Sequence, residues 1–446
     1  MKKILVLGAG LVARPLVKYL LNQGTMNVTV ADQVLAKAES LVSNHPLGTA
    51  LDLDINNIAL LKKTVARADI VISLLPWMFH PKIAELCLEY KKHLVTASYV
   101  KDDMQAMDSR AKQNGLIFLN EIGVDPGLDH MSAMQIINRT KNAGGKITGF
   151  RSYCGGLPAL ENNNNPLGYK FSWSPEGAML AATNDGRYLE DDRIIEVPGS
   201  RLFEHYWLVD IPGAGAFEAY VNRDAIPYRE IYGIPSAANM YRGTLRNIGY
   251  CETWDFFKKL GLLNRKMKFN FSEITPRQVI ANIINSNGPD LKKEVAAYLK
   301  IPEFALTIKK LDWLGLFNDE KLDIGTCSVF DMFAHTLLNK LTYHKGEKDL
   351  LIQHHEFTAE YPDHKKEIIT STLIDTGIPG GDTSMSRTVG LPVAIATKLL
   401  AEGKIDLSGV HIPVLPEIYE PVLAELKTLN IAFTERKTTL TDPINT

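Results

Sequence analysis

The chain has 446 residues, of which 45% are hydrophobic and 22% are charged, and its formal net charge at pH 7 is −2. This length exceeds what a single hydrophobic core usually supports, so two or three domains are expected. The near-neutral charge excludes the strongly basic surface typical of proteins that bind nucleic acid or anionic membranes.

The N-terminal residues predict a strand, a tight turn and a helix. An apolar run leads directly into the motif GAGLVA at residues 8–13. Gly8 lies at the sharp turn, Gly10 lets backbone N–H groups approach a pyrophosphate, and small Ala13 allows close helix packing. A second apolar run ends at Asp32, 22 residues after Gly10, where a carboxylate can bind an adenosine ribose. Together these residues predict dinucleotide binding, whereas a lone glycine pattern would also fit an ordinary strand-to-helix turn.

Strands and helices continue to alternate up to residue 120. This rhythm predicts an α/β fold with a doubly wound parallel sheet. Ligands of such sheets bind beyond the carboxyl ends of the strands. The predicted strands are 28–31, 50–54, 70–75, 93–98 and 116–120, and the predicted helices are 36–42, 58–65, 81–90 and 104–114.

The pattern changes after residues 125–127. Strand-like runs then lie among loops rich in Gly, Asn and Pro, residues 244–341 are mostly helical in pattern, and strands return before a final amphipathic helix. The predicted strands here are 147–154, 206–211, 349–357 and 367–373, and the predicted helices are 276–285, 291–299, 328–338 and 388–401.

Polar side chains follow two strands of the predicted parallel sheet. Tyr99 follows the strand at 93–98, and Asp125 follows the strand at 116–120, so both are expected in one crevice. Tyr99 could donate a proton there, although a tyrosine at a strand end is more often an amphipathic plug. Asp125 is harder to explain by packing alone.

Other candidate residues have a plain structural explanation beside the functional one. Cys154 precedes two glycines and could be a nucleophile, but a small buried thiol is the default. Arg223 could bind a carboxylate through two hydrogen bonds, yet most surface arginines are only solvated. The residues at 354–356 (HHE) alternate between the faces of a strand, so no metal site is expected. Hydrolase and phosphate-loop motifs are missing, which leaves hydride transfer by a cofactor.

The four cysteines are far apart and form no CxxC pair, which favours a reducing compartment. Lys2 and Lys3 precede a predicted strand and not a signal peptide, and no apolar run reaches the roughly 18 residues of a membrane span. A cytoplasmic protein without membrane or nucleic-acid partners is therefore expected.

Read in order, several unusual segments are similar to the saccharopine reductase family, the glutamate-forming saccharopine dehydrogenases. The resemblance covers nearly the whole chain. Its segments are 8–15 (GAGLVARP), 73–80 (SLLPWMFH), 96–100 (TASYV), 120–130 (NEIGVDPGLDH), 152–158 (SYCGGLP), 165–174 (NPLGYKFSWS), 222–224 (NRD), 242–246 (RGTLR) and 388–392 (TVGLP).

The resemblance implies three domains and a reaction. An α/β Rossmann domain would comprise residues 1–124 with 388–446, and an α/β (α+β) domain for substrate binding and dimerisation would comprise 125–243 with 345–387. A helical domain would be inserted at 244–344. The implied enzyme is a homodimer in lysine metabolism. It interconverts saccharopine with glutamate and 2-aminoadipate 6-semialdehyde through an imine, using NAD(P).

The family's functional positions transfer to this sequence through the matching segments. The implied catalytic residues are Tyr99, Asp125 and Cys154, and the implied substrate-binding residues are Ser98, Gly155, Arg223 and Thr244. Together with the glycine loop and Asp32, the predicted cofactor-binding residues are Gly8, Gly10, Leu11, Val12, Ala13, Asp32, Ser73, Leu75, Pro76 and Phe79.

One position departs from the family's fungal members, which use NADP and carry a small residue and then Arg after the second strand. This chain has Ala31-Asp32-Gln33 there. Because a carboxylate repels a 2′-phosphate and binds a free 2′-hydroxyl, we expect NAD rather than NADP.

Two alternative functions stay open at this point. A related imine reductase, such as carboxynorspermidine or homospermidine synthase, would need an acidic pocket for its cationic substrates. Arg223 and the RGTLR segment at 242–246 favour a carboxylate-rich substrate instead. A non-catalytic NAD-binding regulator would bind the cofactor without turnover.

Overall fold

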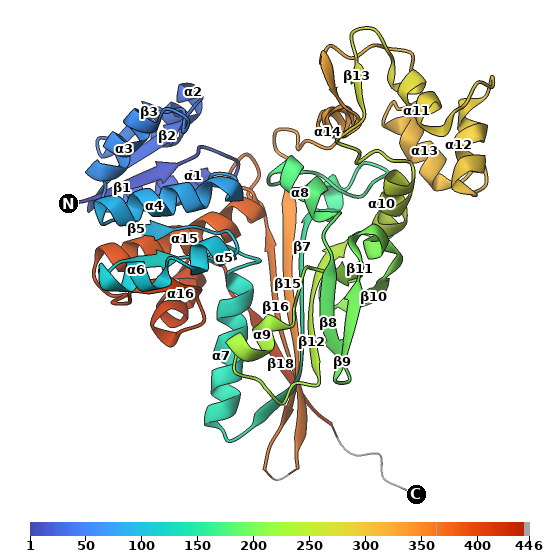
Figure 1. The fold of residues 1–446 in the computed structure, drawn as a ribbon. Coiled ribbons are helices and arrows are strands. Elements are labelled where there is room, and N and C mark those ends of the chain that lie inside the picture. Colours follow the sequence, from blue (N-terminus) through green and yellow to red (C-terminus); the bar gives the residue numbers. More distant parts are fainter. Residues whose placement is uncertain (363, 441–446) are drawn as a thin grey trace, which may run out of the picture. The chain divides into compact units, whose positions relative to one another are not determined.

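The computed structural model describes residues 1–362 and 364–440, which form two compact units (Figure 1). The first unit comprises residues 1–152, 228–237 and the described residues from 353 onward. The second comprises residues 153–227 and 238–352. A search of the described residues finds no helix that could span a lipid bilayer.

The first unit contains a parallel sheet of seven strands in the order β17-β6-β5-β4-β1-β2-β3. The chain runs outward from β1 in one direction and from β4 in the other, so the switch point lies between these two strands. This sheet confirms the predicted doubly wound α/β fold. Its strands are β1 (Lys2–Leu7), β2 (Met26–Asp32), β3 (Gly48–Asp52), β4 (Ile70–Ser73), β5 (His93–Val95), β6 (Ile117–Leu119) and β17 (Gly409–His411).

Both faces of this sheet are buried. Leu5 and Leu7 belong to a core cluster with residues of α3, α4, α5 and α6, while the alternating Ile4 and Val6 are buried on the opposite face. Helix α15, from the C-terminal part of the chain, packs against α1. The helices of this part are α1 (Ala13–Asn22), α2 (Leu35–Val42), α3 (Ile58–Arg67), the short 3₁₀ turn η1 (Trp77–Phe79), α4 (His80–Tyr90), α5 (Asp102–Gln105), α6 (Asp108–Gln113) and α15 (Ser384–Ala401).

The predicted single helix at 104–114 is wrong, because the chain forms α5 and α6 instead. The Met107 N–H donates to Met104 O at 3.0 Å, an i to i+3 turn that interrupts the α-helical pattern. Both methionines are buried, so the break lets two turns of chain reach the core. Apolar spacing alone did not reveal this interruption.

The rest of the first unit consists of helices and antiparallel strands. The last strand, β18, pairs with β16 and does not join the parallel sheet, so residues 434–440 depart from the predicted Rossmann segment 388–446. Residues 441–446 of that segment, and residue 363 of the predicted second domain, lie outside the described residues. The elements are α7 (Leu128–Asn142), α9 (Pro227–Ile231), β16 (Lys366–Thr376), α16 (Pro416–Thr428) and β18 (Thr434–Leu440).

A second, mixed sheet has the main order β10-β11-β12-β7-β15-β16-β18. The long strands β7 (Lys146–Pro158) and β15 (Asp349–Glu360) each contain residues of both units. In the second unit, β10 pairs antiparallel with β11, and β11 with β12. Its other strands are β8 (Gly186–Glu190), β9 (Arg193–Val197), β10 (Tyr206–Ile211), β11 (Gly215–Val221) and β12 (Asn239–Arg246).

The segment predicted to be helical, 244–344, lies in the second unit and is mainly helical. Its assignment as a separate domain stays a prediction. Its elements are α10 (Tyr250–Lys259), β13 (Lys268–Asn270), α11 (Pro276–Ile284), α12 (Leu291–Leu299), α13 (Leu306–Trp313), β14 (Thr326–Ser328) and α14 (Val329–Lys340). Further short helices of this unit are η2 (Leu160–Asn162), α8 (Pro175–Ala181) and η3 (Gly199–Glu204).

Candidate active site

The carboxyl ends of five parallel strands meet at one edge of the first sheet. The Gly8 N–H donates to Ala31 O at 2.9 Å, which joins the end of β1 to the end of β2. The Thr96 N–H donates to Leu119 O, also at 2.9 Å, and joins β5 to β6 in the same way. The loops after β1, β2, β4, β5 and β6 therefore leave the sheet side by side.

The loop after β1 has the backbone that a dinucleotide requires. Gly8 has φ +102°, and a Cβ atom there would lie 3.3 Å from the carbonyl group of Leu74. A Cβ on Gly10 would meet no atom within 4 Å, so this backbone is open to a ligand. Helix α1 has Val12 at its N-cap without a side-chain cap, which leaves N–H groups for phosphate oxygens.

Asp32 at the end of β2 braces this loop. Its Oδ2 accepts a hydrogen bond from the Ala9 N–H at 2.8 Å, and its Oδ1 accepts one from the Val34 N–H at 2.9 Å. Each carboxylate oxygen can accept a second hydrogen bond, so a ribose hydroxyl can still bind. The loop and Asp32 together fit a nicotinamide dinucleotide.

The other predicted cofactor residues lie at the same edge of the sheet. Ser73 is the buried last residue of β4, and Leu75, Pro76 and Phe79 follow it. Leu11 is 62% exposed in the glycine loop, whereas Ala13 is fully buried against the sheet, as its small size predicts. Their individual contacts to a cofactor stay predictions.

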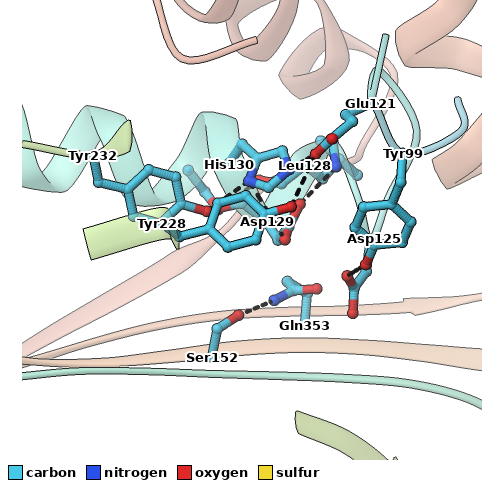
Figure 2. A network of polar contacts seen from close by, with 12 residues as sticks. Tyr99, Glu121, Asp125, Leu128, Asp129, His130, Ser152, Tyr228, Tyr232 and Gln353 are labelled. Carbon is cyan, nitrogen blue, oxygen red and sulfur yellow. Dashed lines mark hydrogen bonds and ion pairs between the residues drawn. The ribbon is translucent and has the colours of Figure 1, made fainter. Parts of the chain in front are cut away.

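The predicted pair Tyr99 and Asp125 lies together. The Tyr99 hydroxyl donates to Asp125 Oδ1 at 3.0 Å, and both residues are half-buried (Figure 2). Such a pair can orient a carboxylate and pass a proton to or from a bound molecule. Their catalytic roles stay predictions.

A buried network holds the two loops that carry this pair, and sequence reasoning assigned it no role (Figure 2). Glu121, which is 4% exposed, accepts a hydrogen bond from the Val100 N–H through Oε1 at 2.9 Å. Its Oε2 lies 2.8 Å from His130 Nε2 and accepts from the Tyr228 hydroxyl at 3.2 Å. The only signal in the sequence is an acidic residue next to a predicted strand end.

His80 is a second residue to which sequence reasoning assigned no role. It is the first residue of α4 and is buried, with Nδ1 2.9 Å from Ser73 Oγ and Nε2 2.7 Å from Ser98 Oγ. Burial lowers the pKa of His80 to about 4, so the ring is neutral at neutral pH. The parallel register could have revealed it, because Ser73 and Ser98 lie at or just beyond the ends of neighbouring strands.

The remaining predicted residues lie in the second unit. Cys154 is buried on β7 and forms no disulfide, and a Cβ on its neighbour Gly155 would lie only 2.8 Å from Leu245 Cβ. Gly155 therefore has a structural reason to be glycine. Thr244 lies on β12 opposite Tyr220 of β11.

Arg223 follows β11 in this unit. It is exposed and has φ +60°, and its carbonyl oxygen accepts a hydrogen bond from the Arg187 N–H at 2.9 Å. The backbone of this turn is thus held in place, and a role of Arg223 in binding a carboxylate stays a prediction.

The sequence matches two family models. Residues 4–119 match the model of the saccharopine dehydrogenase NADP binding domain, and residues 123–431 match that of the saccharopine dehydrogenase C-terminal domain. The chain belongs to the saccharopine dehydrogenase family. Saccharopine dehydrogenase [NADP(+), L-glutamate-forming] of Schizosaccharomyces pombe is 37% identical over 423 residues, which cover 93% of this chain and 94% of that protein.

Other relatives extend the likeness to this family. Mitochondrial alpha-aminoadipic semialdehyde synthase of Bos taurus is 36% identical over 98% of this chain, which spans 48% of that longer protein. The solved structure of apo saccharopine dehydrogenase (L-Glu forming) from Saccharomyces cerevisiae matches 98% of this chain and all of that chain, with a TM-score of 0.88 and 35% identity. A homospermidine synthase from Legionella pneumophila, 12% identical with a TM-score of 0.55, shares the fold alone.

These findings support a nicotinamide dinucleotide cofactor without confirming the predicted preference for NAD. The matching family model is named for NADP, and the fungal relatives carry NADP(+) in their names.

The buried neutral state of His80 predicts a pH-dependent stability difference. Between pH 6.5 and about 4 the unfolded chain binds a proton at His80 that the folded chain does not. The free energy of unfolding therefore decreases as the pH is lowered through this window. Relative to His80→Gln, the wild type should lose about 2 kcal/mol of unfolding free energy between pH 7 and pH 5.

Urea unfolding of both proteins at the two pH values measures this difference. His45→Gln serves as a matched control, because His45 is only partly buried. An equal loss in wild type and His80→Gln would contradict the buried neutral state.

Proposed function

We propose that this chain is an L-glutamate-forming saccharopine dehydrogenase. It oxidises saccharopine to glutamate and 2-aminoadipate 6-semialdehyde, and it also catalyses the reverse reaction, in lysine metabolism. The observation that carries the proposal is the match over 98% of this chain to the yeast enzyme of that name, which itself is matched over its whole length. The Tyr99–Asp125 pair at the ligand-binding edge of the sheet supports it.

Residues of the first unit can accept and donate the protons that this reaction transfers. A bound nicotinamide dinucleotide supplies hydride transfer. In the oxidative direction the substrate's secondary amine becomes an imine, which adds water and separates into glutamate and an aldehyde. We infer that Asp125, oriented by the Tyr99 hydroxyl, accepts a proton from the amine or the attacking water. Cys154 is proposed as a further residue near the reacting amine.

The substrate carries three carboxylates, and the proposed binding residues match that charge. Arg223 would bind one carboxylate with its guanidinium, and Thr244 and Ser98 would donate hydroxyl hydrogen bonds. The glycine at 155 would assist through its backbone. The homodimer and the cytoplasmic location likewise stay predictions.

The first prediction is turnover of saccharopine. Purified protein with saccharopine and NAD or NADP should form reduced cofactor, and glutamate should appear in equal amount, because each C–N bond that breaks releases one glutamate. The absorbance of the reduced cofactor and an amino-acid assay measure the two products.

Each alternative function predicts a different result in this assay. Cofactor binding without any reduced cofactor would favour the non-catalytic regulator and overturn the proposal. Turnover with polyamine substrates but not with saccharopine would favour a homospermidine or carboxynorspermidine synthase.

The second prediction concerns cofactor choice, for which we propose NAD over NADP. A 2′-phosphate placed beside Asp32 would meet like charge, so wild-type kcat/KM should be higher with NAD. Asp32→Asn removes the charge and keeps an oxygen that can accept from the Ala9 N–H. It should lower the ratio of the NAD to the NADP values of kcat/KM by about tenfold, equivalent to about 1.4 kcal/mol.

Asp69→Asn is the matched control for this change. Asp69 also accepts a backbone hydrogen bond, from the Lys3 N–H at 2.7 Å, but it lies at the amino ends of the strands. Its substitution should leave the cofactor ratio unchanged. A wild type that prefers NADP, or uses both equally, would contradict the proposed preference.

The third prediction separates substrate from cofactor binding. Arg223→Ala should raise the KM for saccharopine about tenfold or more, since a charge-assisted pair is lost, and change the KM for the cofactor little. Steady-state kinetics with each ligand varied in turn measures both values. Arg193→Ala, another exposed arginine of the second unit, is the control. Equal increases in both KM values would show that Arg223 is not a carboxylate ligand.

A further inference from the structure

His80 occupies an unusual place for a buried histidine, because both of its ring nitrogens face serine hydroxyls. Nδ1 is 2.9 Å from Ser73 Oγ at the end of β4, and Nε2 is 2.7 Å from Ser98 Oγ beyond β5. Thr96 Oγ1 lies 3.3 Å from the same Nε2. The ring thus connects two neighbouring strand ends at the ligand-binding edge of the sheet.

The hydrogen-bond requirements of Ser73 fix the direction of this chain. Among the described residues, the hydrogen-bond partner of the Ser73 side chain is His80 Nδ1, and Ser73 is 1% exposed. A buried hydroxyl whose hydrogen has no acceptor costs free energy. Ser73 and the buried Thr96 both face the ring, and the Ser73 contact is the shorter, at 2.9 Å against 3.3 Å, so the Ser73 hydroxyl donates to Nδ1. A neutral imidazole carries one N–H, which then lies on Nε2 and donates to Ser98 Oγ.

Ser98 is thereby left as a donor. Its Oγ accepts from His80 Nε2, its partner among the described residues, and Ser98 is half-buried. The hydroxyl hydrogen is therefore available to a ligand that accepts hydrogen bonds. His80 and Tyr99, the residue after Ser98, both line a small pocket, whose wall also includes Asn120 and Lys101. The Ser98 hydroxyl can donate this hydrogen to a carboxylate of a ligand.

We propose that His80 is a positioning residue, which accepts from Ser73 and donates to Ser98 so that the Ser98 hydroxyl donates to a substrate carboxylate. The proposal rests on the proposed saccharopine dehydrogenase function. His80 itself keeps its proton and contacts no substrate atom in this arrangement.

A double-mutant cycle tests whether His80 acts through Ser98. His80→Asn and Ser98→Ala should each raise the KM for saccharopine about tenfold, as expected for a hydrogen bond to a charged group. The double variant should have the KM of Ser98→Ala, because its target hydroxyl is already gone. The KM for the cofactor should change little throughout. His80→Gln, whose amide nitrogen can take the place of Nε2, should restore most of the saccharopine affinity.

His93→Asn is the matched control. His93 is a partly buried histidine whose Nδ1 accepts from the Ile117 N–H at 3.1 Å at the amino end of β5. Its substitution should leave the KM for saccharopine unchanged. Increases in KM that multiply in the double variant, or an equal rise in the KM for the cofactor, would overturn the positioning role.

The tautomer of wild-type His80 can be measured independently of activity. Nitrogen-15 NMR should show a hydrogen on Nε2 and a bare Nδ1, and this signal should disappear in His80→Gln. A hydrogen on Nδ1 would overturn the proposal even if every variant is folded and active. A wild type with the expected tautomer that does not turn over saccharopine would overturn the proposed function and the carboxylate contact, while the hydrogen-bond chain itself would stand.

Discussion

The buried carboxylate of Glu121 is the interaction on which the rest of the site depends. A charge removed from water is stable only when several donors surround it. Glu121 meets that demand by binding the backbone after β5 together with side chains of α7 and α9. Tyr99 directly precedes the backbone that Glu121 binds, and Asp125 lies in the same loop as Glu121, so the network helps to hold the two residues at their 3.0 Å contact.

Each strand end at this edge of the first unit therefore contributes a different kind of chemical group. The end of β1 offers bare backbone, β2 offers one carboxylate, and the ends of β4 and β5 offer hydroxyls joined by His80. The loop after β6 adds the acid of the Tyr99–Asp125 pair. Parallel pairing makes this possible, because the carboxyl ends of all parallel strands lie at the same edge of the sheet, even when the strands are far apart in the sequence.

Local patterns predicted the parallel sheet, the glycine loop, Asp32 and the proximity of Tyr99 to Asp125. They could not predict contacts between segments that do not follow strands of the same predicted sheet. Glu121 and Tyr228 are 107 residues apart, and nothing near either residue indicates the other. The break between α5 and α6 depends on the burial of two methionines, which apolar periodicity does not distinguish from a continuous helix. The pairing of β18 with β16 was missed because an exposed, charged strand lacks an apolar signal.

Asp32 has a consequence for how cofactor choice could change during evolution or design. The same carboxylate that would bind a ribose also fixes the Ala9 N–H and the Val34 N–H. One side chain would thus both bind the ribose of the cofactor and hold the conformation of the glycine loop. Replacing Asp32 with a residue that can bind a 2′-phosphate would also remove the acceptor of the Ala9 N–H in the glycine loop. A change of coenzyme preference would therefore need a new hydrogen-bond acceptor for this loop. A single substitution that supplied none would leave the glycine loop less ordered than it is in this protein.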